Sequence, residues 1–163
     1  MRVLVISIFA VFLICQNTSA NSISNAANKN HIKDQIDSLL THHPVKASYY
    51  LNTHFEPETV SDQIFYNIRM GTYQLIKKNK EAAADYFNKG KNLAISFYKL
   101  NDYYKQISQL AYKLNLNGDY NISLTLYDKA CNYYRQIKDS INLAKTISSK
   151  SSALISLGKN EKA

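Results

Sequence analysis

Hydrophobic side chains recur at helical spacing over most of the chain, and the middle of the sequence shows this most clearly. Between Asp102 and Asn117 the apolar positions fall on one face of a helix: Tyr103, Ile107, Leu110, Ala111 and Leu114. Gly118 follows, and glycine readily adopts the left-handed conformation that ends a helix. From Tyr120 to about Ile137 a second stripe runs through Leu124, Tyr127, Ala130, Cys131 and Tyr134. The pattern predicts two amphipathic helices packed antiparallel.

The same arrangement recurs with a period of forty residues when the turn positions Lys78, Gly118 and Gly158 are aligned. Small residues follow each turn at one shared offset, and aromatic residues follow the first two at another; they are Ala83, Ser123 and Ala163, then Phe87 and Tyr127. Small side chains let helices approach closely, so we expect helix contacts at these positions. Before Lys78 the pattern is displaced by one residue, which predicts a looser turn in the first repeat.

The period divides the rest of the chain. We expect repeats at about 61–101, 102–138 and 139–163, preceded by a degenerate N-terminal helical hairpin at 31–60 in which Pro44 opens the second helix. The third repeat is incomplete at Ala163, so either another copy covers its first helix or the chain is the front part of a longer protein. Residues 21–30, rich in Asn and Ser, are expected to form a flexible tail.

The first twenty residues have a different character. Arg2 is followed by the uncharged run VLVISIFAVFLIC from Val3 to Cys15, and small residues stand at Thr18 and Ala20. This is the pattern of a signal peptide (1–20) cleaved before Asn21, and the run is too short to span a bilayer comfortably. The alternative is a segment kept as an N-terminal anchor. Cleavage predicts a periplasmic or secreted protein with no stable membrane span.

Composition narrows the function classes. The 163 residues include 20 Lys+Arg against 12 Asp+Glu, a formal charge of +8, with only four Gly and two Pro. Scarce Gly and Pro exclude turn-rich β-sandwiches and collagen-like chains. Export argues against a nucleic-acid partner for the basic charge and favours an acidic one. Cys131 is the only cysteine after position 15, so we expect no internal disulfide in the mature chain and interpret its thiol as a small buried side chain.

On these residues the chain resembles the tetratricopeptide repeat family. Its pattern of small, turn and aromatic positions is matched by Ala111, Gly118, Ser123, Tyr127 and Ala130, and the sequence GDY at Gly118–Tyr120 is typical of its turn. The resemblance covers about 61–163 and implies an all-α fold, a right-handed αα-solenoid of antiparallel helix hairpins. Two features depart from the family: Ile107 replaces the usual aromatic residue, and forty residues replace thirty-four, which implies longer second helices.

Catalytic chemistry is not indicated. The glycines at 71, 90, 118 and 158 cannot form a phosphate-binding loop, and no HExxH or CxxC motif occurs. His42, His43 and His54 could approach one another, but adjacent histidines point apart and no acid is fixed nearby. We therefore expect exposed turn histidines, no metal, no cofactor and no enzymatic activity.

The expected function is binding. In the family the first helix of each repeat lines a concave groove, and the matching positions are Tyr66, Arg69, Tyr73, Lys77, Lys105, Ser108, Tyr112, Asn115, Lys145, Ser148 and Ser152. Tyrosine and basic side chains suit an acidic or extended peptide of a protein partner. The resemblance also implies an alternative, the truncated extracytoplasmic sensor module of a membrane signalling protein of the diguanylate cyclase or histidine kinase type.

Overall fold

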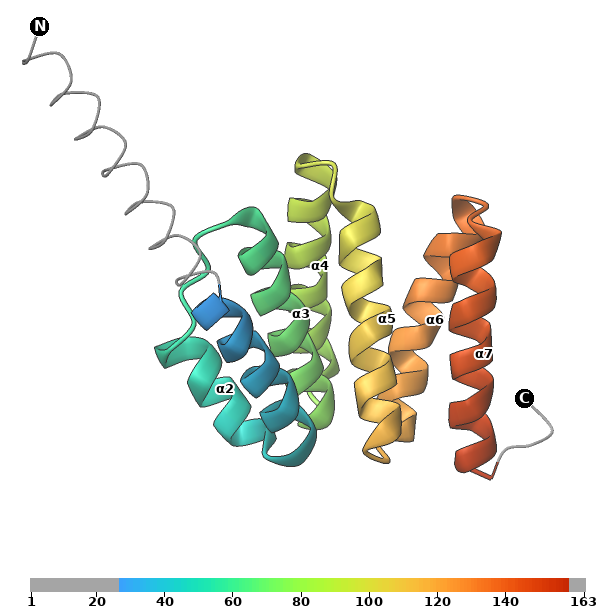
Figure 1. Cartoon of the computed structure of the whole chain (residues 1–163), viewed down its shortest axis with the longest axis horizontal. Helices are drawn as coiled ribbons and strands as arrows, with labels where there is room; N and C mark the ends of the chain where they lie inside the picture. The colour runs from blue at the N-terminus through green and yellow to red at the C-terminus, as the bar shows by residue number, and fades with distance from the viewer. Residues whose placement is uncertain (1–26, 159–163) are drawn as a thin grey trace, which may run out of the picture. The chain divides into compact units, whose positions relative to one another are not determined.

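The computed structural model describes residues 27–158, and these residues contain helices and no strand, which confirms the predicted all-α fold for this part of the chain (Figure 1). The chain divides into two units after Gln35, each described by itself. Residues 27–35 of the first unit are helical. The second unit opens with helical residues 36–42 and continues with α2 (Pro44–Thr53), α3 (Val60–Ile76), α4 (Lys80–Ser96), α5 (Leu100–Leu116), α6 (Tyr120–Gln136) and α7 (Ser140–Ser156).

The predicted signal peptide at 1–20 lies outside the described residues, as do residues 21–26 and 159–163. The prediction of a flexible tail at 21–30 is wrong for residues 27–30, which are helical. Composition suggested a coil there, but each residue added to an existing helix gains a backbone hydrogen bond at little further cost. Among the described residues, no helix combines the length and apolar character needed to cross a bilayer.

Helix ends in the second unit follow the sequence closely. At α3 the Thr59 hydroxyl accepts from the Asp62 backbone N–H at 3.1 Å, and the Asp62 carboxylate accepts from the Thr59 N–H at 3.2 Å. Asn79 and Asp139 cap α4 and α7 in the simpler way, each accepting from a backbone N–H three residues later. Pro44 occupies the first turn of α2, as the sequence predicts.

The turns after the longer helices share one geometry. The residue with positive φ recurs every twenty positions, at Lys78, Tyr98, Gly118, Lys138 and Gly158. At the four turns from Lys78 to Lys138, the N–H of the following residue donates back to a carbonyl of the last helical turn, as Asp119 does to Leu114 at 3.0 Å. Gly118 and Gly158 therefore occupy equivalent bends, and turns between repeats match turns within them.

Two expectations about the repeat are corrected by this regularity. The turn at Lys78 is no looser than the turn at Gly118, because α3 and α5 begin forty residues apart and so do α4 and α6. The second helices are not longer than the first, since α3 to α7 all contain 17 residues. The extra length relative to a 34-residue repeat is thus shared by both helices of the hairpin.

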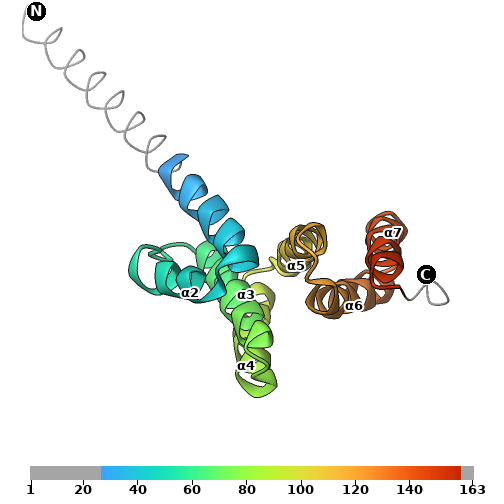
Figure 2. The same cartoon turned by 90° about the horizontal axis from the view of Figure 1, so that it is seen from below.

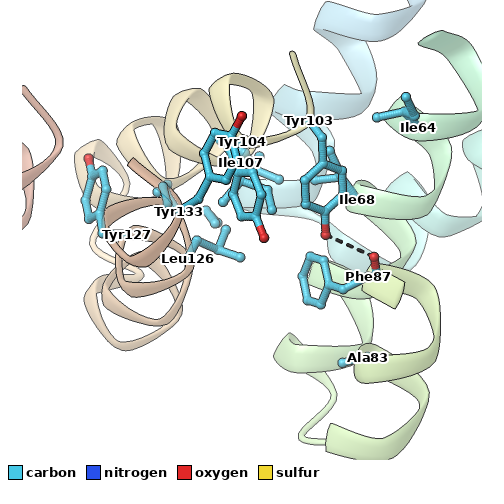
Figure 3. Packing of buried hydrophobic residues seen from close by; sticks show 14 of the residues in the cluster. Ile64, Ile68, Ala83, Phe87, Tyr103, Tyr104, Ile107, Leu126, Tyr127 and Tyr133 are labelled. Carbon is cyan, nitrogen blue, oxygen red and sulfur yellow. Dashed lines mark hydrogen bonds between the residues drawn. The ribbon is translucent and has the colours of Figure 1, made fainter. Parts of the chain in front are cut away.

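Small residues sit where helices meet. Ala111, Ser123 and Ala130 are fully buried, and the Ser123 hydroxyl donates to the Ala111 carbonyl across the contact of α5 and α6 at 2.8 Å. Between α4 and α5 the Tyr103 hydroxyl donates to the Phe87 carbonyl at 3.0 Å (Figure 3). Cys131 is buried and unpaired, as expected. Burial of the apolar side chains at these helix contacts supplies the main driving force for packing one helix pair on the next.

Helices α5, α6 and α7 of the second unit lie in two layers. Seen nearly end-on, α5 and α7 lie on one side and α6 lies between them on the other (Figure 2). α6 packs along both α5 and α7, whereas α5 and α7 touch each other only slightly. The space above α6 is therefore bounded by α5 on one side and α7 on the other.

Candidate ligand-binding groove

A groove of about 720 Å³ lies over this space. One face of α5 lines it through residues spaced by three or four positions: Lys105, Ser108, Gln109, Tyr112 and Leu116. Arg69 of α3 and Asp37 of segment 36–42 form one wall, and α7 forms the other. Its volume lies in the range of sites that bind small molecules or peptide segments.

The wall beside α3 is built around a buried carboxylate. Asp37 is 5% exposed and accepts hydrogen bonds from Arg69 Nε at 2.8 Å and Arg69 Nη2 at 3.1 Å. Lys113 Nζ donates to the same carboxylate at 2.7 Å. Burial by itself raises the pKa of Asp37, but the Arg69 guanidinium and the Lys113 ammonium outweigh that effect and hold the pKa below its usual value.

Arg69 supplies positive charge to the groove wall. Its third nitrogen, Nη1, donates to Gln106 Oε1 at 3.1 Å, and its guanidinium carbon lies 3.9 Å from the centre of the Phe65 ring. Arg69 lines the groove, and three of its five N–H groups donate to Asp37 and Gln106 within the wall. The sequence did not predict Asp37 as the partner of Arg69, because Asp37 lies outside the repeats, in the N-terminal hairpin.

The groove is electropositive. Its lining holds four cations, from Arg69, Lys105, Lys113 and Lys145, against the single carboxylate of Asp37. The four cations and the one carboxylate leave a formal excess of three positive charges within the lining, and Lys105 and Lys145 supply two of them. A cleft lined by one sign of charge concentrates ligands of the opposite sign.

Five of the eleven predicted groove residues line this groove: Arg69, Lys105, Ser108, Tyr112 and Lys145. Tyr112 is 51% exposed, so much of its side chain is open to a ligand. Ser108 lies one helical turn before it on the same face.

The other six predicted positions do not line the groove. Tyr66 donates through its hydroxyl to Asn52 Oδ1 at 2.8 Å, Asn115 is buried, and Tyr73 is half-buried against the core. Lys77 is exposed at the C-terminus of α3, and Ser148 and Ser152 are exposed on α7. On α7 the residues that line the groove are Asn142, Lys145, Thr146 and Ser149 instead.

The structure adds residues that the sequence did not predict. From α7 come Asn142, Thr146 and Ser149, and from α6 come Tyr127 and Tyr134. Tyr127 was expected only as a filler between helix pairs, and its ring is indeed buried in the cluster, but its hydroxyl reaches the groove lining. The one sequence feature that pointed to a role in the groove was a tyrosine, rather than a phenylalanine, at this core position.

The histidines are not gathered into a site. His42, His43 and His54 are exposed, and the His54 ring stacks on Tyr50 with centroids 4.6 Å apart. Within residues 27–158 no group of three or more His, Cys, Asp or Glu side chains is arranged to hold a metal ion.

Comparisons with protein-family models, with curated proteins and with solved structures each gave no match to this chain.

Proposed function

We propose that the protein is a helical-repeat scaffold that binds an acidic, extended peptide segment of a protein partner in the groove over α5. The observation that carries the proposal is the groove itself, whose lining combines Lys105 and Lys145 with the exposed Tyr112 side chain. Lysines attract carboxylates, and tyrosine offers contact area with a polar tip at low entropic cost. The electropositive lining disfavours basic peptides.

The finer fold assignment belongs to the same proposal. The chain builds a tetratricopeptide-like αα-solenoid, preceded by a signal peptide that exports it to the periplasm or the medium. The twenty-residue recurrence of positive-φ turns and the matched length of α3 to α7 support the repeat. The exported location rests on the pattern in residues 1–20.

Peptide binding is testable with one pair of tyrosine variants. A fluorescein-labelled, glutamate-rich dodecapeptide is titrated with the purified protein and followed by fluorescence anisotropy. Tyr112→Ala should weaken binding about tenfold, as expected when an interface tyrosine is truncated. Tyr98→Ala is the matched control, because Tyr98 is 98% exposed and lies outside the groove lining.

Two results would count against the proposal: no binding of the acidic peptide by the wild type, or equal weakening by Tyr112→Ala and Tyr98→Ala. Both variants should keep the wild-type melting temperature, because neither ring is part of the buried core. A fall in melting temperature with Tyr112→Ala would show that the residue is structural.

A further inference from the structure

Two hydroxyl groups in the groove lining have no hydrogen-bond partner. They are Tyr127 OH from α6 and Ser108 Oγ from α5, and each oxygen is buried. Tyr127 is only 1% exposed as a whole. Figure 3 shows its ring beside the α5 ribbon, with the hydroxyl pointing away from Leu126. Buried hydroxyls without partners are uncommon because they forfeit the hydrogen bonds that water would supply.

Few groups of the protein are placed to hydrogen-bond with these two hydroxyls. Burial raises the pKa of Tyr127, and the nearby hydroxyls of Ser149 and Ser123 lower it only in part. Tyr127 therefore keeps its proton and remains a donor. The Ser108 hydroxyl lies close to Tyr134. An occupant with acceptor oxygens would satisfy both groups.

The charges around the two hydroxyls favour an anion. Lys105 lies one helical turn before Ser108 on α5, and Lys145 lies one turn before Ser149 on α7, and all four line the groove. The only carboxylate in the lining, Asp37, is already bound by Arg69 and Lys113. Lys105 and Lys145 thus share the groove lining with the two hydroxyl groups, while the one carboxylate of the lining is engaged by other cations.

We infer that the groove between α5 and α7 holds a single carboxylate, the side chain of a Glu or Asp within the bound peptide, with Tyr127 and Ser108 donating hydrogen bonds to it and Lys105 and Lys145 supplying counter-charge. This inference rests on the proposed function, because the peptide delivers the carboxylate. Hydrogen bonds to a charged acceptor are the stronger kind, so specificity for an acidic side chain follows.

The test compares two peptides that differ by one atom type. The probes are fluorescein-labelled Gly-Ser-Gly-Glu-Gly-Ser-Gly and its Gln isostere, both amidated at the C-terminus so that no terminal carboxylate competes. We expect the Glu peptide to bind wild-type protein at least tenfold more tightly than the Gln peptide. Tyr127→Phe and Ser108→Ala should each reduce Glu-peptide affinity about fivefold and leave Gln-peptide affinity unchanged.

Tyr127→Phe also has a stability readout. It removes only an unpaired hydroxyl, so its melting temperature without peptide should equal or exceed that of the wild type. Tyr103→Phe is the matched control, because the Tyr103 hydroxyl is bonded to Phe87 and lies outside the groove lining. It should lower the melting temperature and leave the Glu-to-Gln preference intact.

The outcomes separate the two proposals. Equal binding of both peptides, or a preference that survives Tyr127→Phe, overturns the carboxylate subsite while leaving peptide binding in place. If neither heptapeptide binds, the dodecapeptide titration decides the proposed function, and the subsite is judged with N-acetylglutamate amide, which should raise the melting temperature of the wild type but not of Tyr127→Phe. No rise, or a larger rise with inorganic phosphate than with the carboxylate, overturns the subsite.

Discussion

Asp37→Asn gives the sharpest test of how the groove wall is held. The Asp37 carboxylate is 5% exposed and binds both Arg69 and Lys113, so it ties segment 36–42 to α3 and α5. The variant keeps the size of the side chain but leaves the buried Arg69 guanidinium without its counter-charge. Breaking one side of a buried ion pair typically costs about 3–5 kcal/mol. Lys113 is more exposed and can turn to water, so we expect the lower end, about 3 kcal/mol.

A loss of that size should lower the melting temperature by roughly 10 °C for a chain of this length. Circular dichroism at neutral pH measures the melting temperature, and urea titration gives the free energy of unfolding. The matched control is Asp85→Asn, because Asp85 is exposed on α4 and its substitution should change stability by less than about 0.5 kcal/mol.

The pH dependence of the free energy of unfolding tests whether the ionised form of Asp37 stabilises the fold. The pKa of Asp37 is lower in the folded protein than its ordinary value of 3.8, so its contribution to stability is fully present above that value. The contribution is lost as pH falls through the folded-state pKa. The stability difference between wild type and Asp37→Asn should therefore stay constant from pH 5 to 8 and shrink below pH 3.8. A difference under 1 kcal/mol at pH 7, or one that persists unchanged at low pH, would refute the reasoning.

Three further changes test the packing. Ala130→Arg should abolish the cooperative thermal transition, because a long charged side chain cannot enter the fully buried contact; Ala84→Arg, at an exposed position of α4, should melt like the wild type. Gly118→Ala should cost about 1 kcal/mol in urea titration, solely through its φ of +87°, since no atom lies within 4 Å of an added Cβ; an unchanged midpoint would contradict this. Tyr103→Phe should cost about 1 kcal/mol by losing its bond to the Phe87 carbonyl, and equal stability would show that the bond contributes nothing.

The fold was largely predictable because its determinants are local. A helical stripe such as Tyr103, Ile107 and Leu110 depends only on residues three or four apart. A residue with positive φ ends a helix wherever it stands, so Gly118 and Gly158 marked the repeat. Glycine did not mark the turns at Tyr98 and Lys138, because these residues adopt the left-handed conformation although they are not glycine.

The groove was predictable only in part because it depends on how helices rotate against one another. Lys105, Ser108 and Tyr112 follow from the face of one helix, α5. Ser148 and Ser152 were misplaced because the face that α7 turns inward is set by its packing on α6. Asp37 was missed since it meets Arg69 across 32 residues of sequence.

The sequence by itself determined the helices, their turns and their forty-residue period, because backbone conformation and amphipathic spacing are short-range properties. Only the tertiary structure decided which side chains share the groove, that Asp37 neutralises Arg69, and that the hydroxyls of Tyr127 and Ser108 lie buried without partners. Those features arise where separate helices converge, and side-chain electrostatics and hydrogen bonding depend on distances that no local pattern encodes.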